Sequence, residues 1–290
     1  MSPDRAPDEG VITTTAEVSR ADAVASAPVR ERGGKRFGLR ATLALNVLSV
    51  LAFFALWTVA TEKRWIAPIF LPSPAMVAEE AGKLVTTGEL WSAILASSRR
   101  VFSGFALAAA VAVPLGIVMG VWAPAKAVFD PFISLLRPLP SITWIPMTML
   151  WLGIGESQKT AIVFLGSWIY ILLSTVESTK RVDPTLIRAA RNLGASDVAV
   201  MREVILPGAL PGIITGLKVT LAIAWSCVLS AEMVAAQTGL GALIWIAKDW
   251  GNLPLVLVGM TGISLTVLVA DALANRLERL LLPWERYRRG

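Results

Sequence analysis

One segment of the sequence has the composition of a phosphate-binding loop. Residues 153–160 read Gly-Ile-Gly-Glu-Ser-Gln-Lys-Thr, and a glycine-rich loop that ends in Lys-Ser or Lys-Thr can hold phosphates with its backbone amides. That motif requires a glycine directly before the lysine, where this chain has Gln158. The segment also joins two hydrophobic stretches that are candidates to cross a membrane. We therefore do not expect it to bind a nucleotide.

The other residues that could do chemistry form no catalytic or metal site in the sequence. Gly239-Leu-Gly241 lacks the third glycine of a dinucleotide-binding fingerprint. The chain has no His, which removes the commonest general base and metal ligand. Its single Cys, Cys227, lies in a hydrophobic stretch, where a packing role is expected. The prediction is no catalytic residue, no metal and no cofactor on this chain, so any energy must enter through a partner.

The composition indicates an integral membrane protein. Hydrophobic residues make up 55% of the 290 residues and charged residues only 17%, which is too little polar surface for a soluble domain of this size. Eleven Trp against two Tyr fit positions at the two membrane–water boundaries. The net charge of +6 does not indicate nucleic acid, because the basic residues lie beside hydrophobic stretches and form no continuous stripe.

Six hydrophobic stretches are candidates to cross a bilayer, which takes about 20 helical residues. The predicted spans are Ala41–Thr61, Val101–Ala125, Pro138–Gly155, Ala161–Val176, Pro211–Val234 and Leu253–Ala270. The third is short and rich in proline, so a re-entrant course is the alternative for it. The predicted fold class is an all-α integral membrane protein with six transmembrane helices.

The distribution of Lys and Arg predicts the orientation. Dense clusters lie in the first 40 residues, in the segment 180–207 and after Ala270. Because cationic segments tend to stay in the cytoplasm, both termini and this segment are predicted to be cytoplasmic. The pair Arg99-Arg100 does not fit the rule, since it then lies at the outer end of the second span.

The N-terminal residues differ in composition from the rest of the chain. Residues 1–40 are rich in Ala, Arg, Asp, Glu and Pro, and contain no apolar run like the core of a signal peptide. They are predicted to be a disordered cytoplasmic tail. Residues 41–282 are predicted to form the membrane domain, and residues 283–290 a cytoplasmic end.

The polar segment 180–207 is predicted to form two short helices. Asp183 is a good N-cap for the first helix, and Pro184 is a good first helical residue because that amide would otherwise be unpaired. Gly194 can end this helix in a left-handed conformation. A second helix is predicted to follow and to end at Pro207. Such a helical pair suits a soluble partner, although a plain solvated loop fits these features equally well.

Several residues of this segment follow a known pattern. Ala189-Ala190, Gly194 and Val204-Ile-Leu-Pro207 match Glu-Ala-Ala, three residues, Gly, nine residues, Ile, any residue, Leu-Pro. They resemble the EAA loop of bacterial ABC importer permeases, with Arg188 where that family has Glu and Val204 where it has Ile. The resemblance implies a coupling helix that docks on an ATP-hydrolysing subunit. The residues implied for this coupling are Asp183, Arg188, Ala189, Ala190, Gly194, Leu206 and Pro207.

Further motifs extend the resemblance over roughly residues 70–285. They are Leu71-Pro-Ser-Pro74, Arg137-Pro-Leu-Pro-Ser-Ile-Thr-Trp-Ile-Pro146, Leu150-Trp-Leu-Gly-Ile-Gly-Glu156, Gly216-Leu217, Ala224-Trp225, Ala231-Glu-Met233 and Gly239-Leu-Gly241. Together they are similar to permeases of the nitrate/sulfonate/taurine/bicarbonate type. The resemblance implies the type I importer permease fold, a bacterial inner membrane, and import of a small organic or inorganic anion such as a sulfonate, taurine or nitrate.

The same resemblance implies an assembly of several proteins. Two copies of the permease, as a homodimer, would enclose a pathway. Two ABC ATPase subunits, which bind ATP and Mg, would dock on the coupling helices, and an extracytoplasmic solute-binding protein would deliver the solute. Nucleotide at one end and loaded receptor at the other would bias a two-state membrane element. The lipid membrane is a further expected partner, and nucleic acid is not expected as one.

The proline-rich third span is a candidate for the wall of that pathway. Pro138, Pro140 and Pro146 break a regular helix there, and non-helical backbone at membrane depth is tolerated only where protein or a water-filled cavity covers it. The alternative is a hairpin bent only for packing. The candidate pathway residues are Arg137, Pro138, Pro140, Trp144, Lys218, Trp225 and Glu232.

Lys218 and Glu232 are ionisable residues within the fifth predicted span. Charged groups inside a membrane usually face a bundle interior or a cavity. On one helix the two lie about 21 Å apart, so they cannot pair directly. Snorkelling of Lys218 to the cytoplasmic boundary, and capping or bridging of the outer loop by Glu232, are the alternatives to a pathway role.

A secondary transporter or channel is the competing class of function. It would need coupling ions or a proton relay, which usually take several intramembrane carboxylates. Only Glu232 is a fair candidate for such a carboxylate, and the sequence shows no inverted repeat. The ABC permease is therefore the favoured prediction and the secondary transporter or channel the alternative.

Overall fold

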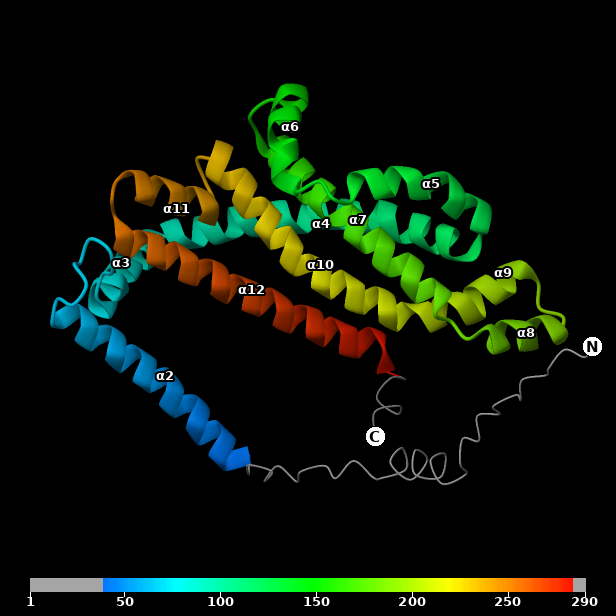
Figure 1. Ribbon diagram of the computed structural model, residues 1–290, viewed down its shortest axis with the longest axis horizontal. Coiled ribbons are helices and arrows are strands. Elements are labelled where there is room, and N and C mark those ends of the chain that lie inside the picture. The colour runs from blue at the N-terminus through cyan, green and yellow to red at the C-terminus, as the bar shows by residue number, and fades with distance from the viewer. Residues whose placement is uncertain (1–38, 284–290) are drawn as a thin grey trace, which may run out of the picture. The chain divides into compact units, whose positions relative to one another are not determined.

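The computed structural model describes residues 39–283, with the backbone alone at residues 39, 40 and 235. All regular structure in these residues is helical, which confirms the predicted all-α class (Figure 1). The predicted tail 1–40 lies outside the described residues up to residue 38, and the predicted end 283–290 lies outside them from residue 284. The chain divides into two units, residues 1–54 and 55–290. The described part of the first unit is the exposed beginning of α2 (Leu39–Glu62).

The second unit contains the end of α2 and all the other described elements. In chain order these are α3 (Pro74–Thr87), α4 (Glu89–Val121), α5 (Ala123–Leu136), the 3₁₀ turn η1 (Ser141–Trp144), α6 (Ile145–Leu152), α7 (Glu156–Lys180), α8 (Pro184–Asn192), α9 (Asp197–Ala199), the π-helix η2 (Val200–Ile205), α10 (Leu206–Ala235), α11 (Leu240–Asp249) and α12 (Leu253–Leu281).

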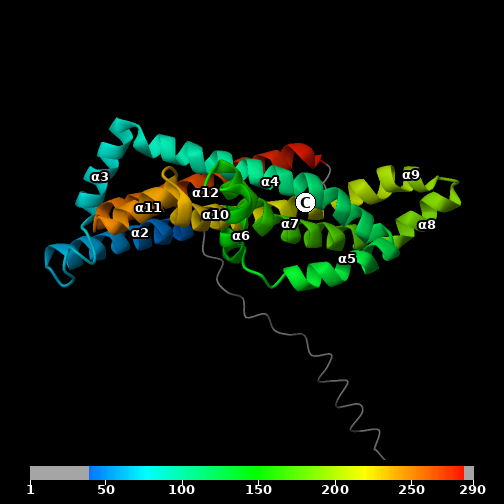
Figure 2. The same ribbon diagram turned by 90° about the horizontal axis from the view of Figure 1, so that it is seen from above.

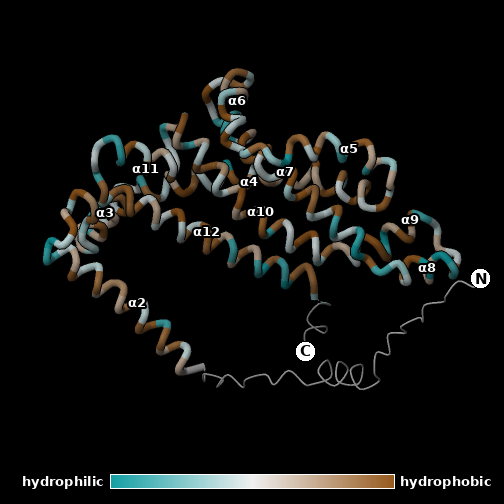
Figure 3. Tube along the Cα trace, in the orientation of Figure 1, coloured by the Kyte–Doolittle hydropathy of each residue, from teal (hydrophilic) through white to brown (hydrophobic). Residues whose placement is uncertain are grey.

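Within residues 39–283, five helices are long and apolar enough to cross a membrane. They are Ala41–Glu62, Glu89–Val121, Glu156–Lys180, Asp197–Val234 and Leu253–Leu281. Each overlaps one predicted span. Hydrophobic residues predominate along these helices, and hydrophilic ones gather around α8 (Figure 3).

The third predicted span, Pro138–Gly155, does not form a single helix. Its apolar helical part, Ser141–Leu152, is too short to cross a membrane unaided. The prolines explain the break, because α5 ends at Leu136 and the backbone at Pro140 is extended, with φ −60° and ψ 142°. In place of the single crossing helix that is predicted here, the chain forms α5, η1 and α6 in succession.

Helix α4 begins at Glu89, well before the predicted start of the second span at Val101. The prediction stopped at Arg99-Arg100, because cations are unfavourable in a hydrocarbon environment. In the structure Arg100 is buried and fully paired, as described below, so the helix continues through this position.

Helices α4 and α7 pack against each other at small residues. Gly104 faces Val163, and Gly120 faces Thr179 further along both helices. Close backbone approach at glycines is typical of helix pairs in membranes. Because the residue numbers at these contacts increase together along both helices, α4 and α7 run parallel. The chain between them, which contains α5, η1 and α6, therefore returns from the C-terminal end of α4 to the N-terminal end of α7.

Helix α10 runs antiparallel to α7, since Gly212 faces Ser178 and Gly216 faces Ser174. A core shared by α4, α7, α10 and α12 contains Val101, Val163, Leu221, Ala224, Trp225, Val228 and Ala270. Helices α3 and α11 lie at one end of this bundle, and α8 and α9 lie at the opposite end, in both views (Figures 1 and 2).

The segment 180–207 forms the predicted helical pair with one difference. Asp183 Oδ1 accepts the Thr185 amide hydrogen at 2.7 Å, and Gly194 follows α8 with φ 84°, as predicted. The prediction that Pro207 ends the second helix is wrong, because α9 continues through η2 directly into α10. The wide π turn, placed directly before the proline, accommodates a ring that would clash with the preceding turn of a regular helix.

Candidate functional site

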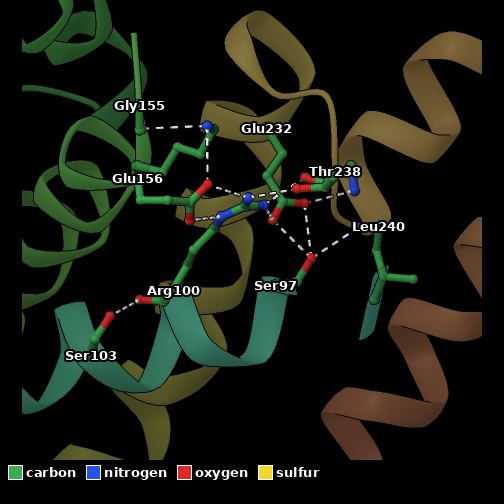
Figure 4. A network of polar contacts seen from close by, with 10 residues as sticks. Ser97, Arg100, Ser103, Gly155, Glu156, Glu232, Thr238 and Leu240 are labelled. Carbon is green, nitrogen blue, oxygen red and sulfur yellow. Dashed lines mark hydrogen bonds and ion pairs between the residues drawn. The ribbon is translucent and has the colours of Figure 1, made fainter. Parts of the chain in front are cut away.

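A dense polar cluster surrounds Arg100 of α4 (Figure 4). The Arg100 side chain is 3% exposed, yet all five of its N–H groups have an acceptor. Nε and Nη2 donate to the two carboxylate oxygens of Glu156 at 2.7 and 2.6 Å. Nη1 donates to Glu232 Oε1 at 2.7 Å and to the Thr238 carbonyl at 2.6 Å. Nη2 also donates to Thr238 Oγ1 at 3.0 Å, so the guanidinium binds three segments at once.

Glu232 is the buried partner in this cluster, with a side chain that is 0% exposed. Besides Arg100, it accepts a hydrogen bond from the Ser97 hydroxyl at 2.8 Å and one from the Gly241 amide at 2.8 Å. Ser97 Oγ in turn accepts the Leu240 amide at 2.9 Å. A buried ion pair is tolerated when its remaining hydrogen-bonding groups are satisfied, as they are here. Glu232 thus joins the end of α10 to the first turn of α11.

The pair Gly239 and Gly241 is required by this cluster. Gly239 has φ 118°, and a Cβ there would lie 2.6 Å from Arg100 Nη1. A Cβ at Gly241 would lie 2.9 Å from Glu232 Cβ. Both values are shorter than real Cβ contacts, so the glycines allow the loop to cover the ion pair.

The segment that resembles a phosphate-binding loop is filled by its own side chains. Glu156, at the start of α7, is 65% exposed but still binds Arg100. Lys159 is buried, and its Nζ donates to the Gly155 carbonyl at 3.3 Å and lies 3.5 Å from Glu156 Oε1. Gln158 is fully buried. The lysine that would hold a phosphate is therefore engaged within the protein.

The sequence reasoning missed Ser97, Arg100, Glu156 and Thr238 as members of this site. One signal was present, since the pair Arg99-Arg100 lay at the wrong end of a span for its charge. An arginine at such a place needs an acidic partner. Glu232 was then the obvious candidate, at the same predicted end of another span.

A second polar site lies at the break between α5 and α6. A cavity of about 330 Å³ is bounded by this break, by α7 and by α10. Its polar lining consists of Arg137, Ser141, Tyr170, Ser226 and Ser230. Of the predicted pathway residues, Arg137 and Pro140 line this cavity, and Pro138 lies between them in the chain.

The structure places the other predicted pathway residues elsewhere. Trp144 packs against the apolar cluster around Ile145, next to the cavity. Trp225 is 2% exposed in the bundle core. Lys218 Nζ pairs with Glu278 Oε2 of α12 at 2.6 Å. Lys218, Trp225 and Glu232 are thus not brought to the cavity that Arg137 lines.

The third site is the end of the bundle formed by α8 and α9. Three large apolar side chains there, Leu186, Leu193 and Val198, are 56%, 89% and 76% exposed. In contrast, Ile187 and Val204 pack inward against the bundle. An apolar surface of this kind, on a polar segment, marks an interaction site.

The predicted coupling residues all lie at this end. Asp183 caps α8 by accepting a hydrogen bond from the Thr185 amide. This hydrogen bond stabilises the ionised carboxylate and holds the pKa of Asp183 below its usual value. The exposed Arg188 donates to Thr185 Oγ1 at 3.4 Å. Ala190 is half-buried on α8, and the other coupling residues are exposed: Ala189, Gly194, Leu206 and Pro207.

Three comparisons with known proteins agree with this architecture. Residues 112–287 match the family described as "Binding-protein-dependent transport system inner membrane component". A probable ABC transporter permease protein of Brucella abortus (strain 2308) is 37% identical, over 84% of this chain and 96% of its own length. The taurine transport system permease protein TauC of Escherichia coli K12 is 36% identical, over 84% and 90%. The putative aliphatic sulfonates transport permease protein SsuC of the same strain is 34% identical, over 79% and 88%.

A solved structure shows the same fold. A chain of the MetNI methionine ABC transporter, in an inward-facing conformation, superposes with a TM-score of 0.57. It covers 67% of this chain and 95% of its own length at 21% identity.

Fold and sites define a multi-pass membrane permease that transports a solute and hydrolyses no ATP itself. The chain belongs to the binding-protein-dependent transport system inner membrane component family and is a permease subunit of an ABC importer. It works with an ATPase partner and a solute-binding protein. The predicted class is confirmed, and nothing in the structure favours the alternative of a secondary transporter or channel.

Proposed function

We propose that this permease imports a small organic anion of the sulfonate class. The observation that carries the proposal is the polar cavity beside the broken segment, where Arg137 supplies a cation and none of the described residues that line the wall is acidic. Two relatives, named for the transport of taurine and of aliphatic sulfonates, support the same class of solute.

The assembly that we propose has two copies of this chain around the pathway. Two ATPase subunits, which bind ATP and Mg, dock on α8 and α9 of the two copies, and a solute-binding protein docks at the opposite end. Support for the ATPase surface comes from the exposed apolar residues Leu186, Leu193 and Val198. The fully buried core of an interface is more apolar than the rest of a protein surface.

We further propose that both termini and the segment 180–207 face the cytoplasm of a bacterial inner membrane. Support comes from the parallel course of α4 and α7, which requires a return between them. With α5, η1 and α6 as that return, the chain makes six traverses, which is an even number. The Lys and Arg clusters then all lie on one side.

Transport by a reconstituted complex tests the proposed substrate. Proteoliposomes that contain this chain, its ATPase and its binding protein are expected to accumulate taurine or ethanesulfonate when ATP is supplied on the ATPase side. A variant with charged side chains in place of apolar ones on the docking surface, Leu193→Glu with Val198→Glu, should insert normally but lose ATP-driven uptake. Uptake of uncharged solutes alone would contradict the proposed class.

Thiol labelling tests the orientation separately. In a Cys227→Ser background, a reagent that cannot cross the membrane is expected to label a cysteine substituted for Gln237 from outside intact cells. The same reagent should spare a cysteine substituted for Ser196 until the cells are opened. The reverse pattern would overturn both the orientation and the docking of an ATPase on α8.

A further inference from the structure

We infer that the cavity beside the broken segment is a binding site for one oxyanion headgroup joined to a short apolar chain. Its residues are Arg137, Ser141, Tyr170, Ser226 and Ser230. The inference rests on the proposed import of an organic anion and adds a place in the membrane domain where that anion is held and selected.

The cavity lies near the middle of α7, a helix that is long and apolar enough to cross a membrane. Tyr170 and Gly166 line it from α7, which runs from Glu156 to Lys180. At 1.5 Å per residue, Tyr170 is about 21 Å from the first of these ends and about 15 Å from the other. Arg137 lines the same cavity and is therefore a cation at membrane depth.

The guanidinium of Arg137 has no partner among the described residues 39–283. It is exposed, and no hydrogen bond or ion pair of this part of the chain includes it. The Tyr170 hydroxyl is likewise without a hydrogen bond there. An unpaired arginine at this depth requires water or an anion, since lipid tails offer no acceptor.

The hydroxyl groups are arranged to assist the cation. Ser226 and Ser230 lie one turn apart on the same face of α10. Ser230 Oγ donates to the Ser226 carbonyl at 3.1 Å, and Ser141 Oγ accepts a weak bond from Cys227 Sγ at 3.2 Å. A hydroxyl can rotate to donate to a new acceptor. Arginine and such donors together suit an oxyanion with several acceptor oxygens.

The rest of the lining is apolar and selects among anions. Leu139, Ile142, Leu165, Ile169 and Ile223 complete the wall. Apolar walls with a few convergent polar groups are typical of sites for small organic ligands, and about 330 Å³ is enough for one of roughly ten heavy atoms. An organic sulfonate fits both parts of the lining, whereas an inorganic anion uses only the polar part.

The test measures the electrostatic preference of the cavity directly. In the purified complex with the ATPase, carrying Cys227→Ser and Ser226→Cys, the introduced thiol is treated with two methanethiosulfonate reagents of similar size. One carries a sulfonate and the other a trimethylammonium group. With each rate divided by that of the same reagent with a free small thiol, we expect the sulfonate reagent to be favoured, and Arg137→Gln to lower the ratio of the two normalised rates by about tenfold or more.

Two further variants provide the controls. Arg137→Lys retains the charge and should keep most of the ratio, whereas Arg276→Gln removes a cation far along α12 and should leave the ratio unchanged. Ethanesulfonate should slow labelling at lower concentrations than nitrate, and Arg137→Gln should abolish this protection. An unchanged ratio in Arg137→Gln, equal protection by nitrate, or a thiol that reacts with neither reagent would overturn the inference.

The labelling result is independent of the proposed function. It needs no uptake, so a charge-selective cavity in a complex that accumulates no sulfonate would refute the proposed substrate and retain the anion site. Conversely, uptake of taurine that survives Arg137→Gln unchanged would retain the proposed function and refute the site.

Discussion

Arg100 and Arg137 both belong to the membrane part of the chain, and their surroundings are opposite. Arg100 is buried, and every N–H group that it carries is bonded to Glu156, Glu232 or Thr238. Arg137 is exposed to a cavity and is bonded to none of the described residues. Arg100, whose donors are all hydrogen-bonded, has none left for a ligand and holds three helices together. Arg137 contributes little to the stability of the fold, and its hydrogen-bond donors are free for a solute.

The largest expected effect is the loss of stability in Arg100→Gln. This change leaves the buried Glu232 without its cation, and breaking such a pair typically costs about 3–5 kcal/mol. Arg137→Gln should change the stability little, because no ion pair is lost. Thermal unfolding of the two variants in detergent measures the difference. Similar melting temperatures for both would show that the two arginines are not distinguished in this way.

The next effect concerns Gly239, which covers the polar cluster around Arg100. Gly239→Ala places a Cβ against Arg100 and Glu232 and also strains a residue with φ 118°, for an expected cost of about 1–3 kcal/mol or more. Gly194→Ala is the matched control, because its φ is 84° but no atom lies within 4 Å of a Cβ there. Thermal unfolding should therefore show a larger shift for Gly239→Ala than for Gly194→Ala, and equal shifts would contradict the close contact.

A smaller effect separates the two acidic partners of Arg100. Glu156 is 65% exposed and Glu232 is 0% exposed. Glu156→Gln should cost only about 0–1 kcal/mol, as for surface pairs, because water can replace the lost carboxylate. Glu232→Gln should cost distinctly more, since no water replaces it. The ranking is measured by chemical or thermal unfolding, and the reverse order would show that burial does not set the value of each bond.

The smallest effect is a pH dependence at the far end of the bundle. The pKa of Asp183 is lowered because the Thr185 amide donates to the ionised carboxylate. The cap therefore stabilises α8 above the ordinary aspartate pKa of about 3.9 and is lost as the pH falls through the lower, folded-state value. A spin label at Asn192, in a Cys227→Ser background, should gain mobility only in this acid range. Asp183→Asn, whose amide oxygen accepts at every pH, should show no such transition.

The sequence predicted the parts of this structure that depend on local composition. The long apolar helices follow from runs of hydrophobic residues, and the caps at Asp183 and Gly194 follow from residue type. The break at Pro138 and Pro140 was also predicted, because proline acts on its own turn of the chain. The course of η2 into Pro207 was not, since a π turn has no comparable residue signature.

The sites were predictable only where one segment supplies them. The coupling residues lie in one segment, and Arg137 and Pro140 lie in another, so both groups were named. The bond between Arg100 and Glu232 joins residues 132 positions apart. No local spacing indicates it, and its one signal in the sequence is the misplaced charge of Arg99-Arg100. The hydroxyl lining from Tyr170, Ser226 and Ser230 depends on how α7 and α10 pack, which is a property of the assembled bundle.

The cluster around Arg100 also bears on how the chain is made. Arg100 is synthesised 56 residues before Glu156 and 132 residues before Glu232. At about 5–20 residues per second, roughly 7–26 s pass before the second carboxylate exists. Until then the carboxylate of Glu156, whose side chain is 65% exposed, is the one partner of the guanidinium, so this part of α4 must stay in contact with water or with the insertion machinery. Closure of the cluster is therefore a late step of biogenesis, because a chain that stops before residue 232 has only the exposed carboxylate of Glu156 to pair with Arg100.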